Sequence, residues 1–94
     1  MAKYVILVTW TDQGVKAAAD TVARADKVRE LGTGLGATIE TILWTMGRYD
    51  IVVVVESPDN ATAARFAAKV SALGNVRTET LPAFTADEVG AIVG

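Results

Sequence analysis

The 94-residue sequence predicts a single α+β domain with the element order β-α-β-β-α-β. Four short segments rich in β-branched residues alternate with two longer segments in which apolar residues recur every three or four positions. Only a few residues link the second and third short segments, whereas a helical segment joins each of the other two pairs. A short link makes an antiparallel hairpin, so this order predicts a four-stranded antiparallel sheet with both helices on one face.

The first strand is expected at residues 3–9, a short run of β-branched and apolar residues. A helix should follow, with Thr11 as its N-cap and an apolar stripe that extends to Leu35. This helix is expected to end among the glycines of segment 32–36, because glycine readily adopts the left-handed conformation that closes a helix.

The second and third strands are expected at residues 37–44 and 49–56. Between them lies a tight turn in which Gly47 should take a positive φ. The third strand is apolar on both faces at its centre, which is typical of a buried central strand.

The second helix is expected to begin with Ser57 as N-cap and Pro58 as its first residue, and to end at Gly74. A fourth strand at 75–81 should stop at Pro82.

A capping box, Thr85-x-x-Glu88, predicts a short C-terminal helix at about 86–93. No linker divides the chain, so residues 1–94 are expected to form one domain.

This topology places the strands in the order 4-1-3-2, with the first and third strands at the centre. Both central strands are apolar on both faces, but the helices cover only one face of the sheet. Leaving apolar side chains in water costs roughly 25 cal/mol per Å². The C-terminal helix is too short to cover a four-stranded sheet. We therefore expect a homodimer, or a higher oligomer built on it, in which two sheets pack face to face.

The composition excludes several classes of chemistry. The chain has no Cys and no His, which rules out disulfides, thiolate nucleophiles, imidazole ligands and His general bases. Its net charge is −2, with no basic patch and no aromatic residues at the centre of the third strand, so we expect no nucleic-acid partner. No apolar run approaches ~18 residues. We therefore expect a cytoplasmic protein with no membrane contact, no metal and no cofactor.

Three blocks of the sequence resemble the GYD-domain family. They are TDQGVK at 11–16, GRYDIVVVVESPD at 47–59, and LGNVRTETL with AFT at 73–85. The resemblance covers essentially the whole chain and implies a ferredoxin-like fold of the dimeric α/β-barrel superfamily. That superfamily includes cofactor-free monooxygenases, haem proteins, isomerases and small-molecule-sensing domains. The family itself consists mainly of uncharacterised bacterial proteins, so the resemblance carries no catalytic residue onto this chain.

The turn between the second and third strands is one candidate site. Tyr49 and Asp50 would line a pocket at one end of the sheet, and Arg48 would pair with an anionic ligand. The alternative is turn chemistry, in which Asp50 bonds turn amides and Tyr49 is an amphipathic strand residue.

A second candidate site combines polar residues of the two edge strands. Residue parity places Glu40 and Trp44 on the face away from the helices, and we expect Arg77 and Glu79 there too. In a dimer these residues would form a polar cluster with an aromatic wall. The alternative is an intersubunit ion pair or solvated edge residues. Trp10, at the end of the first strand, would stack on a ligand or anchor an interface.

Three functions remain open from the sequence. The first is a homodimeric small-molecule-binding or sensory domain, which we favour. The second is a cofactor-independent enzyme that uses carboxylates and Tyr. The third is an oligomeric accessory protein that binds another protein.

Overall fold

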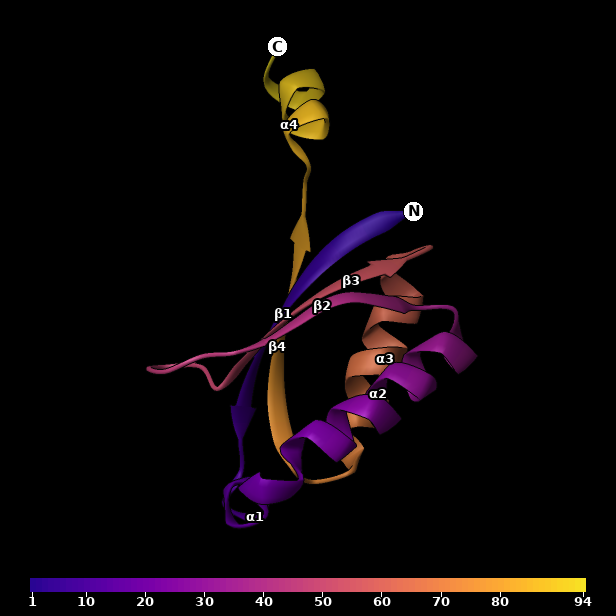
Figure 1. Cartoon of the computed structure of the whole chain (residues 1–94). Coiled ribbons are helices and arrows are strands. Elements are labelled where there is room, and N and C mark those ends of the chain that lie inside the picture. Colours follow the sequence, from indigo (N-terminus) through magenta and orange to yellow (C-terminus); the bar gives the residue numbers. More distant parts are fainter.

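The computed structural model describes residues 1–94 as two layers, a four-stranded antiparallel sheet and two helices packed on one of its faces (Figure 1). The strand order is β2-β3-β1-β4, which confirms the predicted order 4-1-3-2 and the ferredoxin-like topology. The strands are β1 (Ala2–Trp10), β2 (Thr38–Trp44), β3 (Ile51–Ser57) and β4 (Val76–Ala83). The helical elements are α1 (Asp12–Lys16), the 3₁₀ turn η1 (Ala18–Asp20), α2 (Thr21–Leu35), α3 (Asn60–Ala72) and α4 (Ala86–Val93).

The core lies between the sheet and the helices α2 and α3. Alternate residues of the two central strands point into it, because successive side chains of a strand face opposite sides. From the sheet these are Tyr4, Ile6, Val8, Ile51, Val53 and Val55. Phe66 of α3 is 2% exposed and packs against this layer.

The first helical segment is broken, whereas the sequence predicted one continuous helix. Thr11 caps α1 as expected, and its side chain accepts a hydrogen bond from the backbone N–H of Gly14. The chain then leaves the helical conformation at Ala17. Arg24 of α2 compensates, because its guanidinium donates to the carbonyl oxygens of Ala17 at 2.7 Å and Gly14 at 3.2 Å. The Ala17 carbonyl also accepts from the backbone N–H of Asp20 at 2.9 Å, so Arg24 adds a second donor to it at the end of α1. The helix α2 ends at Gly36 with φ 90°, as expected of a glycine C-cap.

The N-cap of α3 is Asp59, so the prediction of Ser57 as the cap was wrong. Ser57 is the last residue of β3 and is fully buried, and its Oγ donates to the carbonyl oxygen of Asp59. The Asp59 carboxylate accepts from the backbone N–H of Thr62 at 2.8 Å. This bond lowers the pKa of Asp59, because it stabilises the charged form.

The fourth strand passes through Pro82 and ends at Ala83, although we expected Pro82 to stop it. Pro82 lies opposite Tyr4 in the β1–β4 ladder. Proline is tolerated here because β4 is an edge strand, where only one side of the backbone needs partners.

The C-terminal helix forms where the capping box predicted it. Thr85 Oγ1 accepts from the backbone N–H of Glu88, and the Glu88 carboxylate accepts from the backbone N–H of Thr85. Figure 1 shows α4 projecting from the end of β4, away from the two layers. Every residue of α4 is exposed. No helix of the chain has the length and apolar character needed to cross a membrane.

Candidate functional site

The sheet face opposite α2 and α3, which we call the open face, has an apolar centre that no helix covers. Its central side chains come from β1 and β3 and are only half-buried: Val5, Leu7, Val52 and Val54. Leu43 and Leu81 on the flanking strands are exposed. Apolar surface arranged in this way marks an interaction site more often than a free surface.

A β-bulge places Glu40 in contact with Lys3 on the open face. The β2–β3 register shifts by one residue between Ile39 and Thr41, which leaves Glu40 as the extra residue. Lys3 Nζ lies 2.6 Å from Glu40 Oε1 and 3.2 Å from Glu56 Oε1. The hydrogen bond to Glu40, and to a smaller extent the one to Glu56, raises the pKa of Lys3. The hydrogen bond from Lys3 lowers the pKa of Glu40.

We predict a pH-dependent contribution of this ion pair to stability. The lowered pKa of Glu40 means that its contribution is present above the usual Glu pKa and is lost as the pH falls through the lowered value. The raised pKa of Lys3 adds a contribution that is present below the usual Lys pKa and is lost as the pH rises through the raised value. The pair therefore acts fully between about pH 4.3 and 10.4.

Urea unfolding of wild type and Glu40→Gln between pH 2 and 8 checks this expectation. The variant should unfold at a slightly lower urea concentration at pH 7, and the difference should vanish at the lowest pH, since exposed ion pairs contribute little. Glu30→Gln, on α2 and without an ion pair, is the matched control. A difference for Glu40→Gln that is equal at both ends of the pH range would contradict the ion-pair mechanism.

Trp44 lies on the helix side of the sheet, so its expected place on the open face was wrong. The bulge at Glu40 reverses the parity of the rest of β2, and Trp44 therefore pairs with the core residue Ile51. Its Nε1–H donates to Thr21 Oγ1 of α2 at 2.9 Å. Trp44 thus fixes the start of α2 against the edge of the sheet.

Arg77 and Glu79 lie on the open face of β4, opposite Thr9 and Leu7 of β1. Tyr49 Oη reaches Glu79 Oε2 at 3.4 Å, across the sheet from the β2–β3 turn. This contact joins one residue of each candidate site that the sequence suggested.

Glu40, Trp44, Arg77 and Glu79, which we expected to cluster only in a dimer, do not form one cluster within a single chain. Glu40 lies by the start of β1, Arg77 lies opposite its end, and Trp44 lies on the other face. A second copy packed on the open face could bring Glu40 near Arg77 and Glu79, but Trp44 on the helix side would not join them.

The β2–β3 turn forms an exposed tip. Gly47 has φ 118°, as the turn predicted. Met46 is fully exposed, and the Arg48 guanidinium lies 5.8 Å from the centre of the Tyr49 ring. Thr45 Oγ1 donates to the carbonyl oxygen of Tyr49 at 2.6 Å, which closes the turn. The tip therefore presents a thioether, a cation and an aromatic ring on a turn closed by a hydrogen bond.

Asp50 connects this turn to the end of β1. Its carboxylate accepts from the backbone N–H of Trp10 at 2.8 Å, and its own N–H donates to the carbonyl oxygen of Val8 at 2.8 Å. Its carbonyl oxygen accepts from the N–H of Thr45 at 2.9 Å. These three bonds favour the turn-chemistry interpretation for Asp50.

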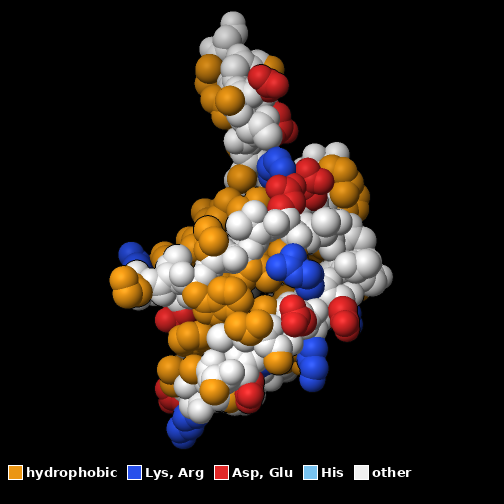
Figure 2. All heavy atoms as spheres, viewed as in Figure 1, with side chains coloured by type: hydrophobic (Ala, Val, Ile, Leu, Met, Phe, Trp, Pro, Cys, Tyr) orange, Lys and Arg blue, Asp and Glu red, His pale blue; other side chains and the backbone are white.

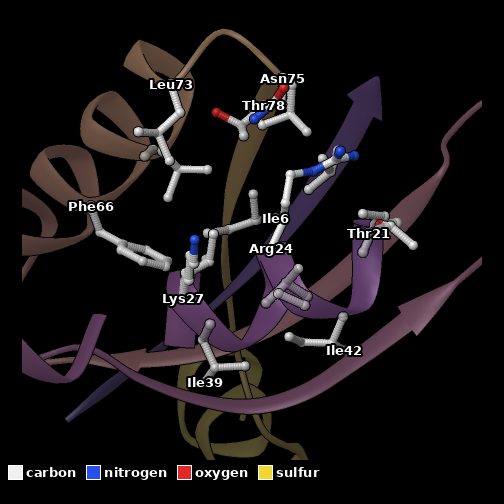
Figure 3. Close-up of a pocket in the computed structure, with 18 of the residues that line it drawn as sticks. Ile6, Thr21, Arg24, Lys27, Ile39, Ile42, Phe66, Leu73, Asn75 and Thr78 are labelled. Atoms are coloured by element: carbon white, nitrogen blue, oxygen red, sulfur yellow. The ribbon is translucent and has the colours of Figure 1, made fainter. Parts of the chain in front are cut away.

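A cavity of about 370 Å³ lies between α2, α3 and the sheet, where the sequence suggested no site (Figure 3). Trp10 lines it, together with mostly apolar residues of both layers. Ala25 of α2 and Ala67 of α3 also line it. Small residues on the inner faces of both helices were the one sequence signal for this space.

Comparison with known proteins identifies the family. The GYD domain matches residues 4–93, which is nearly the whole chain. The chain is also 34% identical over 84 residues to the glutamine synthetase and cystathionine beta-lyase binding protein of Thermus thermophilus, and the match covers 88% of each chain. The chain therefore belongs to the GYD domain family.

Proposed function

We propose that this protein is a homodimeric accessory protein that binds a metabolic enzyme. The observation that carries the proposal is a large uncovered apolar surface on a chain whose Thermus relative is named for binding two enzymes. This surface has two parts, the open face of the sheet and one side of α4 (Figure 2). A homodimer that also binds another protein needs one surface for its own assembly and another for its partner.

The open face fits self-association. Its half-buried valines and leucine form an apolar centre, and charged residues surround that centre, as in protein interfaces with an apolar core and a polar rim. The rim carries both signs: Lys3 and Arg77 against Glu40, Glu56 and Glu79. Two copies packed face to face would remove the valines from water and pair rim charges of opposite sign.

The C-terminal helix supports the same assembly. Its apolar residues Val89, Ile92 and Val93 are 41–77% exposed. The helix projects away from the sheet and the other helices of its own chain (Figures 1 and 2). An isolated helix of eight residues is marginal in water and needs packing to persist. We propose that α4 packs on the second copy.

The turn tip fits the enzyme contact. It stands at the end of the β2–β3 hairpin, away from the centre of the open face (Figure 1). Arg and Tyr are enriched among the residues that dominate binding energies, and Met adapts its shape to a partner. Met46, Arg48 and Tyr49 supply all three on a turn that a hydrogen bond from Thr45 to Tyr49 closes.

Biolayer interferometry with purified glutamine synthetase and cystathionine beta-lyase from the source organism of this chain tests the proposal. The wild-type protein should bind at least one of the two enzymes. The double variant Met46→Ala/Arg48→Ala should bind at least tenfold more weakly, since loss of a central contact costs more than about 1–2 kcal/mol. Arg65→Ala/Lys69→Ala, which removes two exposed cations of α3, should bind like wild type.

Two outcomes would count against the proposal. Absence of wild-type binding to both enzymes at micromolar concentration would overturn the accessory role. Equal binding by wild type and the Met46→Ala/Arg48→Ala variant would overturn the assignment of the tip as the contact.

A further inference from the structure

The cavity between the helices and the sheet is too large to be a packing defect. Its 370 Å³ would hold roughly a dozen water molecules at about 30 Å³ each. It is partly open to solvent, which makes it a pocket and not an enclosed void. The volume lies instead in the range of small-molecule sites, about 300–1,000 Å³.

The wall is apolar over most of its area. Fourteen of the nineteen lining residues are hydrophobic. Ile6 and Val53 line the cavity from the sheet, and Val28, Phe66 and Val70 line it from α2 and α3. Figure 3 shows Ile6 and Phe66 among them. Water gains little in such a space, whereas an apolar molecule of matching size would be stabilised by burial.

The charged residues of the wall are all cationic. Arg24 and Lys27 line the cavity from α2, and no acidic residue lines it. Neither of the two forms an ion pair; Arg24 is half-buried, whereas Lys27 is exposed, so its amino group is open to solvent as well as to the cavity. The chain as a whole has a net charge of −2, so the sign of the charge on the cavity wall is opposite to that of the whole chain. Such a wall favours an anionic group on the occupant.

An unpartnered hydrogen-bond donor completes the site. The Nε1–H of Trp10 is buried and has no acceptor within the chain, whereas the Nε1–H of Trp44 donates to Thr21. Buried polar groups are hydrogen-bonded in the large majority of cases, and an exception needs a reason. Trp10 lines the cavity, although its Nε1 is closed to a water-sized probe, so a small rotation of the indole would bring the N–H to an oxygen atom of an occupant.

We infer that this cavity binds a small monocarboxylate with an apolar body, whose charge is neutralised by Lys27 and Arg24 and whose oxygen accepts from Trp10 Nε1–H. The apolar body lies between Phe66 and the sheet. Arg24 is already fixed by its bonds to the end of α1, so Lys27 is the cation that adjusts to the ligand. The site is separate from the open face and from the turn tip. Its failure would therefore leave the proposed enzyme binding unaffected.

Titration of the ¹⁵N-labelled full-length protein with decanoate, below its micelle concentration, tests the inference by NMR. The indole N–H signal of Trp10 can be assigned because it is the indole signal that remains in the Trp44→Phe variant. In wild type, the shift of this signal should grow with decanoate concentration and reach a plateau. Lys27→Gln should weaken decanoate binding about tenfold, because hydrogen bonds to charged groups are worth more than neutral ones. Lys27→Gln should leave the binding of decanol, which has the same chain without the charge, unchanged.

Two controls keep the test decisive. Lys69→Gln removes an exposed cation of α3 that does not line the cavity, and it should bind decanoate like wild type. Trp10→Phe keeps an aromatic ring without the donor and should weaken binding of both ligands. If Trp10→Phe does not fold, the comparison of Lys27→Gln with Lys69→Gln decides. Absence of a saturable Trp10 shift in wild type, or equal affinities of these two Lys variants, would overturn the inference.

Discussion

Val55→Asp is expected to leave the chain unfolded at 25 °C. Val55 is 0% exposed and lies at the centre of β3, between Tyr4 of β1 and Ile39 of β2. The new carboxylate would be buried with no cation opposite it, which costs several kcal/mol. That cost is comparable with the whole stability of a small domain, about 5–15 kcal/mol. Far-ultraviolet circular dichroism should show no cooperative thermal transition.

Val54→Asp is the matched control, one residue away on the same strand. Val54 faces the open side, so its carboxylate would remain accessible to water in a single chain. We expect this variant to fold with a cooperative transition but to lose the proposed self-association. A cooperative transition for Val55→Asp, or an unfolded Val54→Asp, would contradict the assignment of the two sheet faces.

Gly14→Ala is expected to lower the free energy of unfolding by about 3 kcal/mol, at the upper end of overpacking effects. A Cβ at Gly14 would lie 1.9 Å from the carbonyl oxygen of Asn75. That oxygen belongs to the backbone and accepts from the N–H of Thr11 at 3.1 Å, so it cannot move aside without breaking the contact between α1 and the start of β4. Urea unfolding should show a clearly lower midpoint.

Gly34→Ala provides the comparison, because a Cβ at Gly34 would meet no atom within 4 Å. In a helix this change is expected to stabilise by about 0.5–1 kcal/mol. The change in the free energy of unfolding should therefore have opposite signs for Gly14→Ala and Gly34→Ala. Equal shifts of the urea midpoint would show that a Cβ at Gly14 is tolerated.

The topology could be predicted from the sequence because each element has its own local signal. The continuous β-branched run in 49–56 and the short turn at Gly47 define the hairpin. Thr11 and Thr85 mark helix starts by their own hydrogen bonds. These signals depend only on residues that are close in sequence, so they can be recognised without knowledge of tertiary contacts.

The placement of site residues was less predictable because it depends on pairing between distant segments. Segment 38–44 has two adjacent polar residues, Glu40 and Thr41, followed by three apolar ones, and this pattern does not mark Glu40 as the extra residue of a bulge. One inserted residue moves Trp44 to the opposite face. In the same way, Ser57 and Asp59 are both good N-caps, and only the length of β3 decides between them.

The cavity could not be foreseen for a different reason. Its volume depends on how far α2 and α3 stand from the sheet, and the alanines at 25 and 67 permit either a close approach or a gap. Likewise, the sequence cannot show that Trp10 Nε1–H lacks an acceptor, because that depends on the positions of all neighbouring acceptors in the folded chain.

The molar mass of the purified wild-type protein in solution, measured by sedimentation equilibrium, tests the central proposal most directly. The packing of two open faces predicts the mass of two chains at micromolar concentration, and the mass of one chain for Val54→Asp. A wild-type protein with the mass of a single folded chain would contradict the face-to-face dimer and, with it, the assembly on which the proposed accessory role rests.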